Sequence, residues 1–153
     1  MLGVVQAASR RLRRCPRGRG QPGQPLRVPV EGQLGLLVRA EKEHTMAFVV
    51  ADLSIELIEK LRPLMSRIRA RDKNLADQLQ RAASSVALNL GEAAYSDPGN
   101  RRARFHTAAG SAGETLAALK VAVAWGVVAR SEGEPATALL NRILPMLWKL
   151  TRG

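Results

Sequence analysis

From Ala51 to the C-terminus, apolar residues recur every three or four positions, and no stretch alternates apolar and polar residues for the length of a β-strand. This period favours amphipathic helices and argues against a sheet. Aromatic residues make up only 3% of the 153 residues, whereas apolar residues make up 46%. The core must therefore consist mainly of Leu, Ile, Val and Ala, and we predict an all-α protein.

The pattern predicts four helices, over about 51–70, 73–95, 98–128 and 135–151. Asp97 and Pro98 are typical of a helix start, with Asp97 as the N-cap and Pro98 in the first helical position. Pro63 should kink the first helix and Pro145 should interrupt the fourth, while residues 131–135 should form a break before the fourth. Four helices with short connections predict an up-down-up-down four-helix bundle.

Residues 1–45 have a different composition. They hold nine Lys or Arg and three Glu, a net charge of +6, together with four Pro, and they show no helical or strand period. Such a segment buries too little apolar area to offset its ordering entropy, so we expect it to be disordered. Three interpretations compete: a basic arm for nucleic acid, an Arg-rich transit peptide, or translated DNA upstream of the true start.

A codon argument favours the third interpretation. Lys42 and Glu43 can be encoded as AAG GAG, a ribosome-binding sequence, and two codons separate it from the codon of Met46. We therefore predict that the natural protein starts at Met46 and that the bundle occupies residues 46–153, which carry a net charge of +5. N-terminal sequencing of the native protein that finds residues before Met46 would overturn this prediction.

Several segments carry a resemblance to a known family: 75–90 (LADQLQRAASSVALNL), 101–105 (RRARF), 109–114 (AGSAGE) and 146–152 (MLWKLTR). Over residues 47–152 the chain resembles the bacterial four-helix-bundle proteins whose founding members are encoded in intervening sequences of 23S rRNA genes. It is also similar to the accessory proteins of diversity-generating retroelements. Where most members read Asn-Ile-Ala-Glu-Gly, residues 89–93 read Asn-Leu-Gly-Glu-Ala.

The resemblance implies a four-helix bundle, assembly into a homo-oligomer such as a ring-shaped pentamer, and nucleic-acid binding, which has been proposed for several members. It implies no established reaction. The likeness to the retroelement accessory proteins makes a reverse transcriptase, or another protein, a partner to consider.

Bundle topology places five cations at one end, because the third helix starts where the fourth one ends. They are Arg101, Arg102, Arg104, Lys149 and Arg152, and Asp97 is the one acidic residue we expect beside them. We predict that these five side chains contact phosphates, with an affinity that falls steeply with salt. The opposite end is less basic, because its cations are diluted by Asp72, Asp77, Glu132 and Glu134.

Three further residues have predicted structural roles. Asn89 falls on the apolar stripe of the second helix, opposite Arg104 and Phe105, and should tie two helices together. Arg81 should form a cross-helix ion pair with Glu114. Small residues mark the contact between the second and third helices, and we attribute them to close packing: Ser84, Ser85, Gly110, Ser111 and Gly113.

No catalytic or metal-binding pattern stands out. The only Glu-x-x-His spacing, Glu41 to His44, lies in the N-terminal segment, and His106 is the sole histidine of the bundle. We find no Gly-rich phosphate loop, no zinc motif and no stretch long enough to span a membrane. We therefore expect a cytoplasmic, non-enzymatic protein without cofactor or metal.

These observations predict an oligomeric bundle that binds structured RNA or DNA through its Arg-rich end. The alternative is an adaptor or assembly module that contacts proteins and does not bind nucleic acid.

Overall fold

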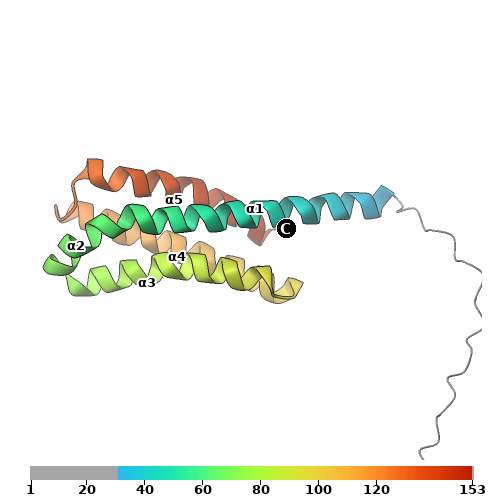
Figure 1. The fold of residues 1–153 in the computed structure, drawn as a ribbon, viewed down its shortest axis with the longest axis horizontal. Coiled ribbons are helices and arrows are strands. Elements are labelled where there is room, and N and C mark those ends of the chain that lie inside the picture. The colour runs from blue at the N-terminus through green and yellow to red at the C-terminus, as the bar shows by residue number, and fades with distance from the viewer. Residues whose placement is uncertain (1–30, 153) are drawn as a thin grey trace, which may run out of the picture.

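The computed structural model describes residues 31–152, and these residues form an elongated helical body (Figure 1). Residues 1–30 of the predicted disordered segment lie outside the described residues. In chain order the elements are α1 (Glu31–Leu61), the 3₁₀ turn η1 (Arg62–Leu64), α2 (Met65–Arg71), α3 (Lys73–Ala94), α4 (Pro98–Ala124) and α5 (Arg130–Thr151).

The predicted all-α four-helix bundle is confirmed. The first rod consists of α1, η1 and α2, with the 3₁₀ turn at Pro63, where the proline was predicted to disturb the helix. The other three rods are α3, α4 and α5. Helix α1 packs against α3 and α5, and α4 packs against the same two helices.

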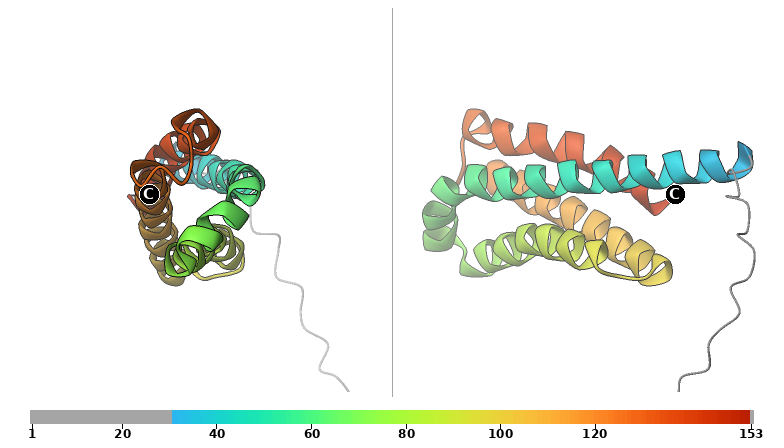
Figure 2. Two further views of the ribbon diagram at one scale, coloured as in Figure 1. Left: turned by 90° about the vertical axis from the view of Figure 1, so that its left-hand side faces the viewer. Right: turned by 45° about the vertical axis from the view of Figure 1, so that its right-hand side comes forward.

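Because neighbouring rods run in opposite directions, the bundle has two distinct ends (Figures 1 and 2). At one end α3 ends, α4 begins and α5 ends, and we call it the C-terminal end. At the other end α2 lies beside the start of α3 and the turn from α4 to α5, and we call it the α2 end. The predicted meeting of the start of α4 with the end of α5 is therefore present.

The core is aliphatic, as the composition requires. Each rod contributes large side chains that are almost completely buried, including Leu57, Leu79, Leu119, Leu140 and Ile143. Phe105 is the aromatic side chain of the core and is 5% exposed. Burial of these side chains from four directions holds the rods together.

Two aspartates set the starts of the middle helices. Asp72 accepts a hydrogen bond from the backbone N–H of Leu75 at 3.0 Å. Asp97 accepts from the backbone N–H groups of Gly99 and Asn100 at 3.1 and 3.2 Å, and Pro98 occupies the first position of α4. Both side chains satisfy helix-start N–H groups that have no partner within the helix, and the predicted start at Pro98 is confirmed.

The start of the first helix was predicted wrongly. Helix α1 begins at Glu31, not near residue 51, so residues 31–45 are helical and not disordered. Once the helix is nucleated by packing of Met46 and Val50 against the core, each added residue costs little, and Arg39 and Glu43 add an ion pair at 3.3 Å one turn apart. Which codon starts the natural protein stays a prediction.

The predicted boundary between the last two helices was also wrong. Helix α4 ends at Ala124, because Gly126 adopts φ +68°, the left-handed conformation that terminates helices. Helix α5 begins at Arg130, so the predicted break at residues 131–135 is its first turn. There Glu132 accepts a hydrogen bond from the backbone N–H of Ala129 at 2.9 Å and caps the helix.

Pro145 does not interrupt α5. The carbonyl group that loses its donor to the proline is that of Asn141, and both residues are exposed, so water can satisfy it. Within residues 31–152 no helix is long and apolar enough to cross a membrane.

Candidate nucleic-acid interface

The five predicted phosphate-binding residues lie at the C-terminal end, but their surroundings differ. Arg101 donates hydrogen bonds from Nε to the carbonyl oxygen of Ala93 at 3.3 Å and from Nη2 to that of Ser96 at 3.2 Å. The first of these carbonyl groups lies in the last turn of α3 and the second just beyond it, where a cation is favoured by the helix dipole. Arg101 therefore joins α4 to the end of α3, and among residues 31–152 no carboxylate forms an ion pair with it.

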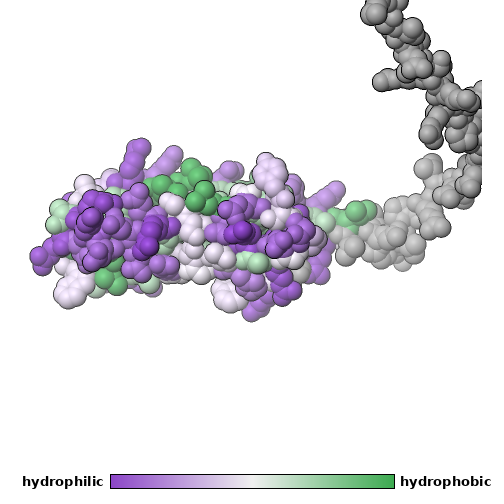
Figure 3. Space-filling view, turned by 90° about the horizontal axis from the view of Figure 1, so that it is seen from below, coloured by the Kyte–Doolittle hydropathy of each residue, from purple (hydrophilic) through white to green (hydrophobic). Residues whose placement is uncertain are grey.

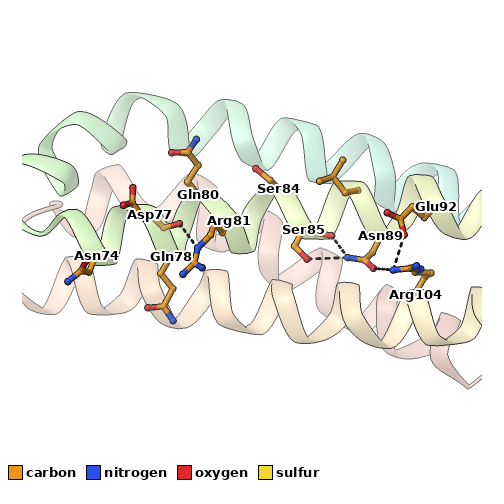
Figure 4. A pocket seen from close by; sticks show the side chains of 11 residues that line it. Asn74, Asp77, Gln78, Gln80, Arg81, Ser84, Ser85, Asn89, Glu92 and Arg104 are labelled. Atoms are coloured by element: carbon orange, nitrogen blue, oxygen red, sulfur yellow. Dashed lines mark hydrogen bonds and ion pairs between the residues drawn. The ribbon is translucent and has the colours of Figure 1, made fainter.

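Arg104 has an acidic partner that the sequence did not lead us to expect. Its Nη1 lies 2.8 Å from Oε2 of Glu92 and donates to Oδ1 of Asn89 at 3.4 Å (Figure 4). The expectation that Asp97 is the one acidic neighbour of this cluster was wrong. Glu92 lies three residues after Asn89 on α3, that is, on the same side of the helix. The prediction that Asn89 faces Arg104 could therefore also have placed Glu92 beside Arg104.

The predicted role of Asn89 is confirmed. Asn89 is buried, with 8% exposed, and its Nδ2 donates to the carbonyl oxygen and to Oγ of Ser85 at 2.8 and 3.1 Å. Oγ of Ser85 in turn lies 2.8 Å from Oγ of Ser111 on α4. This chain of polar contacts ties α3 to α4 through the interior.

The remaining three cations are exposed. Among the described residues, Arg102, Lys149 and Arg152 form no ion pair. The guanidinium carbon of Arg152 lies 5.6 Å from the centre of the Trp148 ring, a cation–π contact one helical turn apart that the spacing alone could have predicted. This stacking orders Arg152 without neutralising it.

An open groove of about 960 Å³ runs beside Lys149 and Arg152, between the end of α5 and the first half of α1. Arg39 and Lys42 of α1 line it together with Glu41 and Glu43. These four charges cancel in sum, so the groove adds cations to the surface without raising its net charge.

A second groove of about 960 Å³ follows α3 (Figure 4). The side chains that line it show that the predicted ion pair of Arg81 with Glu114 was wrong. Arg81 does not pair with Glu114, because its Nε points to the carbonyl oxygen of Asp77 at 3.4 Å. The partner of Glu114 is Gln78, whose Nε2 donates to Oε1 at 3.1 Å. The side chain that reaches Glu114 from α3 is therefore three residues before the predicted one, while Asn89 and Arg104 meet as predicted.

The small residues have mixed roles. Ser85 and Ser111 meet at the contact of α3 and α4, as predicted, but Gly110 and Gly113 do not. A Cβ atom at either glycine would meet nothing within 4 Å, so close packing of these two helices does not require a glycine there.

At the α2 end, two of the cations are paired with carboxylates. Nη2 of Arg67 lies 2.7 Å from Oε1 of Glu132, and Nη2 of Arg69 lies 2.9 Å from Oδ1 of Asp77. The hydrogen bond from Arg67, and next the one from the backbone N–H of Ala129, hold the pKa of Glu132 below its usual value. The predicted dilution of this end by acidic residues is confirmed.

The comparisons with known proteins fit the bundle. A family model described as 23S rRNA-intervening sequence protein matches residues 47–149. The chain belongs to this family. No match to the chain is found among curated proteins.

One solved structure supports the fold of this family member. It is the 1.70 Å crystal structure of a protein of unknown function from the S23 ribosomal protein family of Bacteroides thetaiotaomicron VPI-5482. The TM-score is 0.64 at 20% sequence identity, and the alignment covers 71% of this chain and 99% of that chain. At this level of identity the likeness concerns the fold alone.

Proposed function

We propose that this protein binds the sugar–phosphate backbone of structured RNA or DNA through the C-terminal end of the bundle, as a binding protein rather than an enzyme. One observation carries the proposal: Arg102, Lys149 and Arg152 are exposed at one end without a carboxylate partner among the described residues. Arg101 and Arg104 lie beside them. The description of the family, which refers to 23S rRNA, is consistent with a nucleic-acid ligand.

The chemistry of the Lys and Arg side chains indicates which feature of a nucleic acid they would recognise. Lys and Arg side chains that contact phosphates position a protein on a helix but do not select a sequence. The bundle offers few aromatic side chains on which bases could stack, so the shape of the backbone is the feature to recognise. Each phosphate that is neutralised releases counterions, which makes binding dependent on salt.

The test compares two triple variants of the full chain. The first, Arg102→Glu with Lys149→Glu and Arg152→Glu, removes the proposed site. The second, Arg62→Glu with Arg71→Glu and Lys73→Glu, changes the same charge at the α2 end, on three exposed cations that also form no ion pair among the described residues. Fluorescence anisotropy with an RNA hairpin, single-stranded RNA and duplex DNA is measured over a salt series.

We expect the first variant to lose about 100-fold in affinity at ~0.1 M salt and about three units of salt slope, since each phosphate contact contributes roughly 0.9 to that slope. The α2-end variant should change both values much less. Both variants carry the same N-terminal arginines, so binding by that segment cancels in the comparison. Equal losses in the two variants would show that net charge, and not this end, determines binding.

The second candidate function is that of a protein-interaction module, and exposed apolar side chains favour it. Phe48, Leu88, Tyr95, Trp125 and Trp148 are each more than half exposed. We propose that the protein is a homo-oligomer, with a pentamer as the assembly to test by light scattering. The resemblance to retroelement accessory proteins makes a reverse transcriptase one partner to test, and a retroelement beside the gene would support it.

A further inference from the structure

The face between α1 and α3 carries a concentration of exposed apolar side chains. Phe48 and Ile55 of α1 are 55% and 52% exposed, and Tyr95, directly after α3, is 96% exposed. Leu88 of α3, which also lines the groove beside Asn89, is 65% exposed. Figure 3 shows a hydrophobic patch in the middle of the edge where α1 and α3 run side by side, between hydrophilic side chains. A row of this kind is typical of a surface that another protein covers.

Two hollows lie along the same face. The first, of about 200 Å³, lies between Phe48, Gly91 and Tyr95 and reaches Phe105 at its inner wall. The second, of about 270 Å³, lies between Ile58, Met65 and Ala83. A cavity of ~150 Å³ accommodates a benzene molecule, so each hollow has room for one large apolar side chain.

The spacing of the hollows fits a helix. Phe48 lines the first hollow and Ile58 and Leu61 line the second, so ten to thirteen residues of α1 separate them, or about 15–20 Å at ~1.5 Å per residue. A partner helix with apolar residues at positions i and i+11 spans the same distance. Its residues at i+4 and i+7 would then lie over Ile55 and Leu88.

The charges of this face select the partner further. Between the two hollows, residues 49–59 of α1 carry Asp52, Glu56 and Glu59 and no cation, although residues 46–153 have a net charge of +5. Arg62, which is exposed, lines the second hollow. Asp52 and Glu59 are exposed, and none of the three carboxylates forms an ion pair among the described residues. Arg101, which lines the first hollow, already donates to carbonyl groups of the chain.

From these observations we infer that the α1–α3 face binds a basic amphipathic helix of a partner protein, with apolar residues at i, i+4, i+7 and i+11 and Lys or Arg beside them. A second copy that docked with the same face would bring Asp52 and Glu59 close to their own copies, and like charges oppose such a contact. In a ring a different face of the next copy would cover this one, and the sedimentation measurement below tests that arrangement. The acidic edge also disfavours nucleic acid here. The inference is therefore independent of the proposed nucleic-acid site at the C-terminal end.

The probe is a fluorescein-labelled 18-residue peptide with Leu at the four positions, Ala and Gln elsewhere, and Lys along both flanks. A matched peptide carries Glu in place of Lys. With the full chain we expect the Lys peptide to bind about tenfold more tightly than the Glu peptide, and Asp52→Lys with Glu59→Lys to reverse this preference. Equal binding of the two peptides would overturn the inference.

The apolar contact is tested with Leu88→Glu and, as a control, Val121→Glu on α4, which is 42% exposed. Leu88→Glu should weaken the Lys peptide about tenfold, Val121→Glu less than about twofold, and both should keep the helical circular dichroism of the parent. An unchanged affinity in Leu88→Glu would overturn the inference.

Two further measurements distinguish this inference from the proposed nucleic-acid site and from a contact between copies of the chain. Leu88→Glu should keep its affinity for the RNA hairpin, whereas the triple variant of the C-terminal end should keep its affinity for the peptide. If sedimentation shows that Leu88→Glu, but not Val121→Glu, breaks an oligomer, the face is a contact between copies and the inference is overturned.

Discussion

Each end of the bundle holds exposed cations that form no ion pair among the described residues and at least one cation paired with a carboxylate, but the way in which the other cations are held differs between the ends. At the α2 end, Arg67 and Arg69 lie within 3 Å of carboxylate oxygens. At the C-terminal end, Arg101 is also held in place, but by the carbonyl groups of Ala93 and Ser96, which orient the guanidinium without cancelling its charge. Counting basic residues therefore does not locate a basic surface, because the type of partner decides how much charge remains.

The largest effect on stability should come from Arg101. Arg101→Ala removes the side-chain donor to the carbonyl oxygen of Ser96 and one of the donors to that of Ala93, and we expect a loss of about 1–2 kcal/mol in the free energy of unfolding. Arg71→Ala at the α2 end, an exposed residue with no ion pair among the described residues, should change it by less than ~0.5 kcal/mol. Urea denaturation measures both, and equal losses would contradict the role we assign to Arg101.

The next effect concerns affinity. Glu92→Gln removes the carboxylate that neutralises Arg104 but keeps a side chain of the same size. If the C-terminal end binds phosphates, this variant should bind the RNA hairpin about fivefold more tightly at ~0.1 M salt, with about one more unit of salt slope. Asp77→Asn, which releases Arg69 at the α2 end, is the control and should leave the affinity nearly unchanged.

Acid should remove the stabilising contribution of one carboxylate at each end of the bundle. Hydrogen bonds from the backbone and side chain of Asn100 lower the pKa of Asp97, and the bond from Arg67 lowers that of Glu132. A lowered folded-state pKa means that each group stabilises the fold above its unfolded pKa, and that this contribution is lost as the pH falls through the folded value.

The melting temperatures of Asp97→Asn and Glu132→Gln should therefore lie below that of the parent at pH 7 and approach it as the pH falls below the folded-state pKa values. Thermal scans at several pH values test this. A difference that persisted unchanged in acid would show that the carboxylate charge is not what stabilises either helix start.

The smallest effects should come from glycines. Gly110→Ala and Gly113→Ala in α4 should each raise the free energy of unfolding by about 0.5–1 kcal/mol, since alanine is the better helix former and the space is open. Gly133→Ala in α5 should gain less stability than these two variants, because its Cβ would lie 3.3 Å from Cγ2 of Val123, which must shift to admit it. A loss of stability at position 110 that depends on protein concentration would instead reveal a second copy packed on α4.

Much of the fold could be predicted from the sequence. The helical period, the Asp97 and Pro98 pair and the aliphatic composition are local properties, and they correctly indicated two of the three connections between the rods and the aliphatic character of the core. The start of α5 was missed because Gly133 and Pro135 disfavour a helix by propensity. Packing of Gly133 against Val123 and capping by Glu132 outweigh that preference.

The candidate site could be predicted only in part. The sequence alone determined that Arg101, Arg102, Arg104, Lys149 and Arg152 share one end, because the direction of four successive helices follows from their short connections. Only the tertiary structure decided that Glu92 neutralises Arg104, that Gln78 replaces Arg81 as the partner of Glu114, and that Arg101 caps α3. The physical reason is that an ion pair or hydrogen bond requires atoms within about 3–4 Å. A shift of less than one turn in the position of a side chain therefore changes a pair such as Arg81 and Glu114, although it leaves the fold and the contact of Asn89 with Arg104 as predicted.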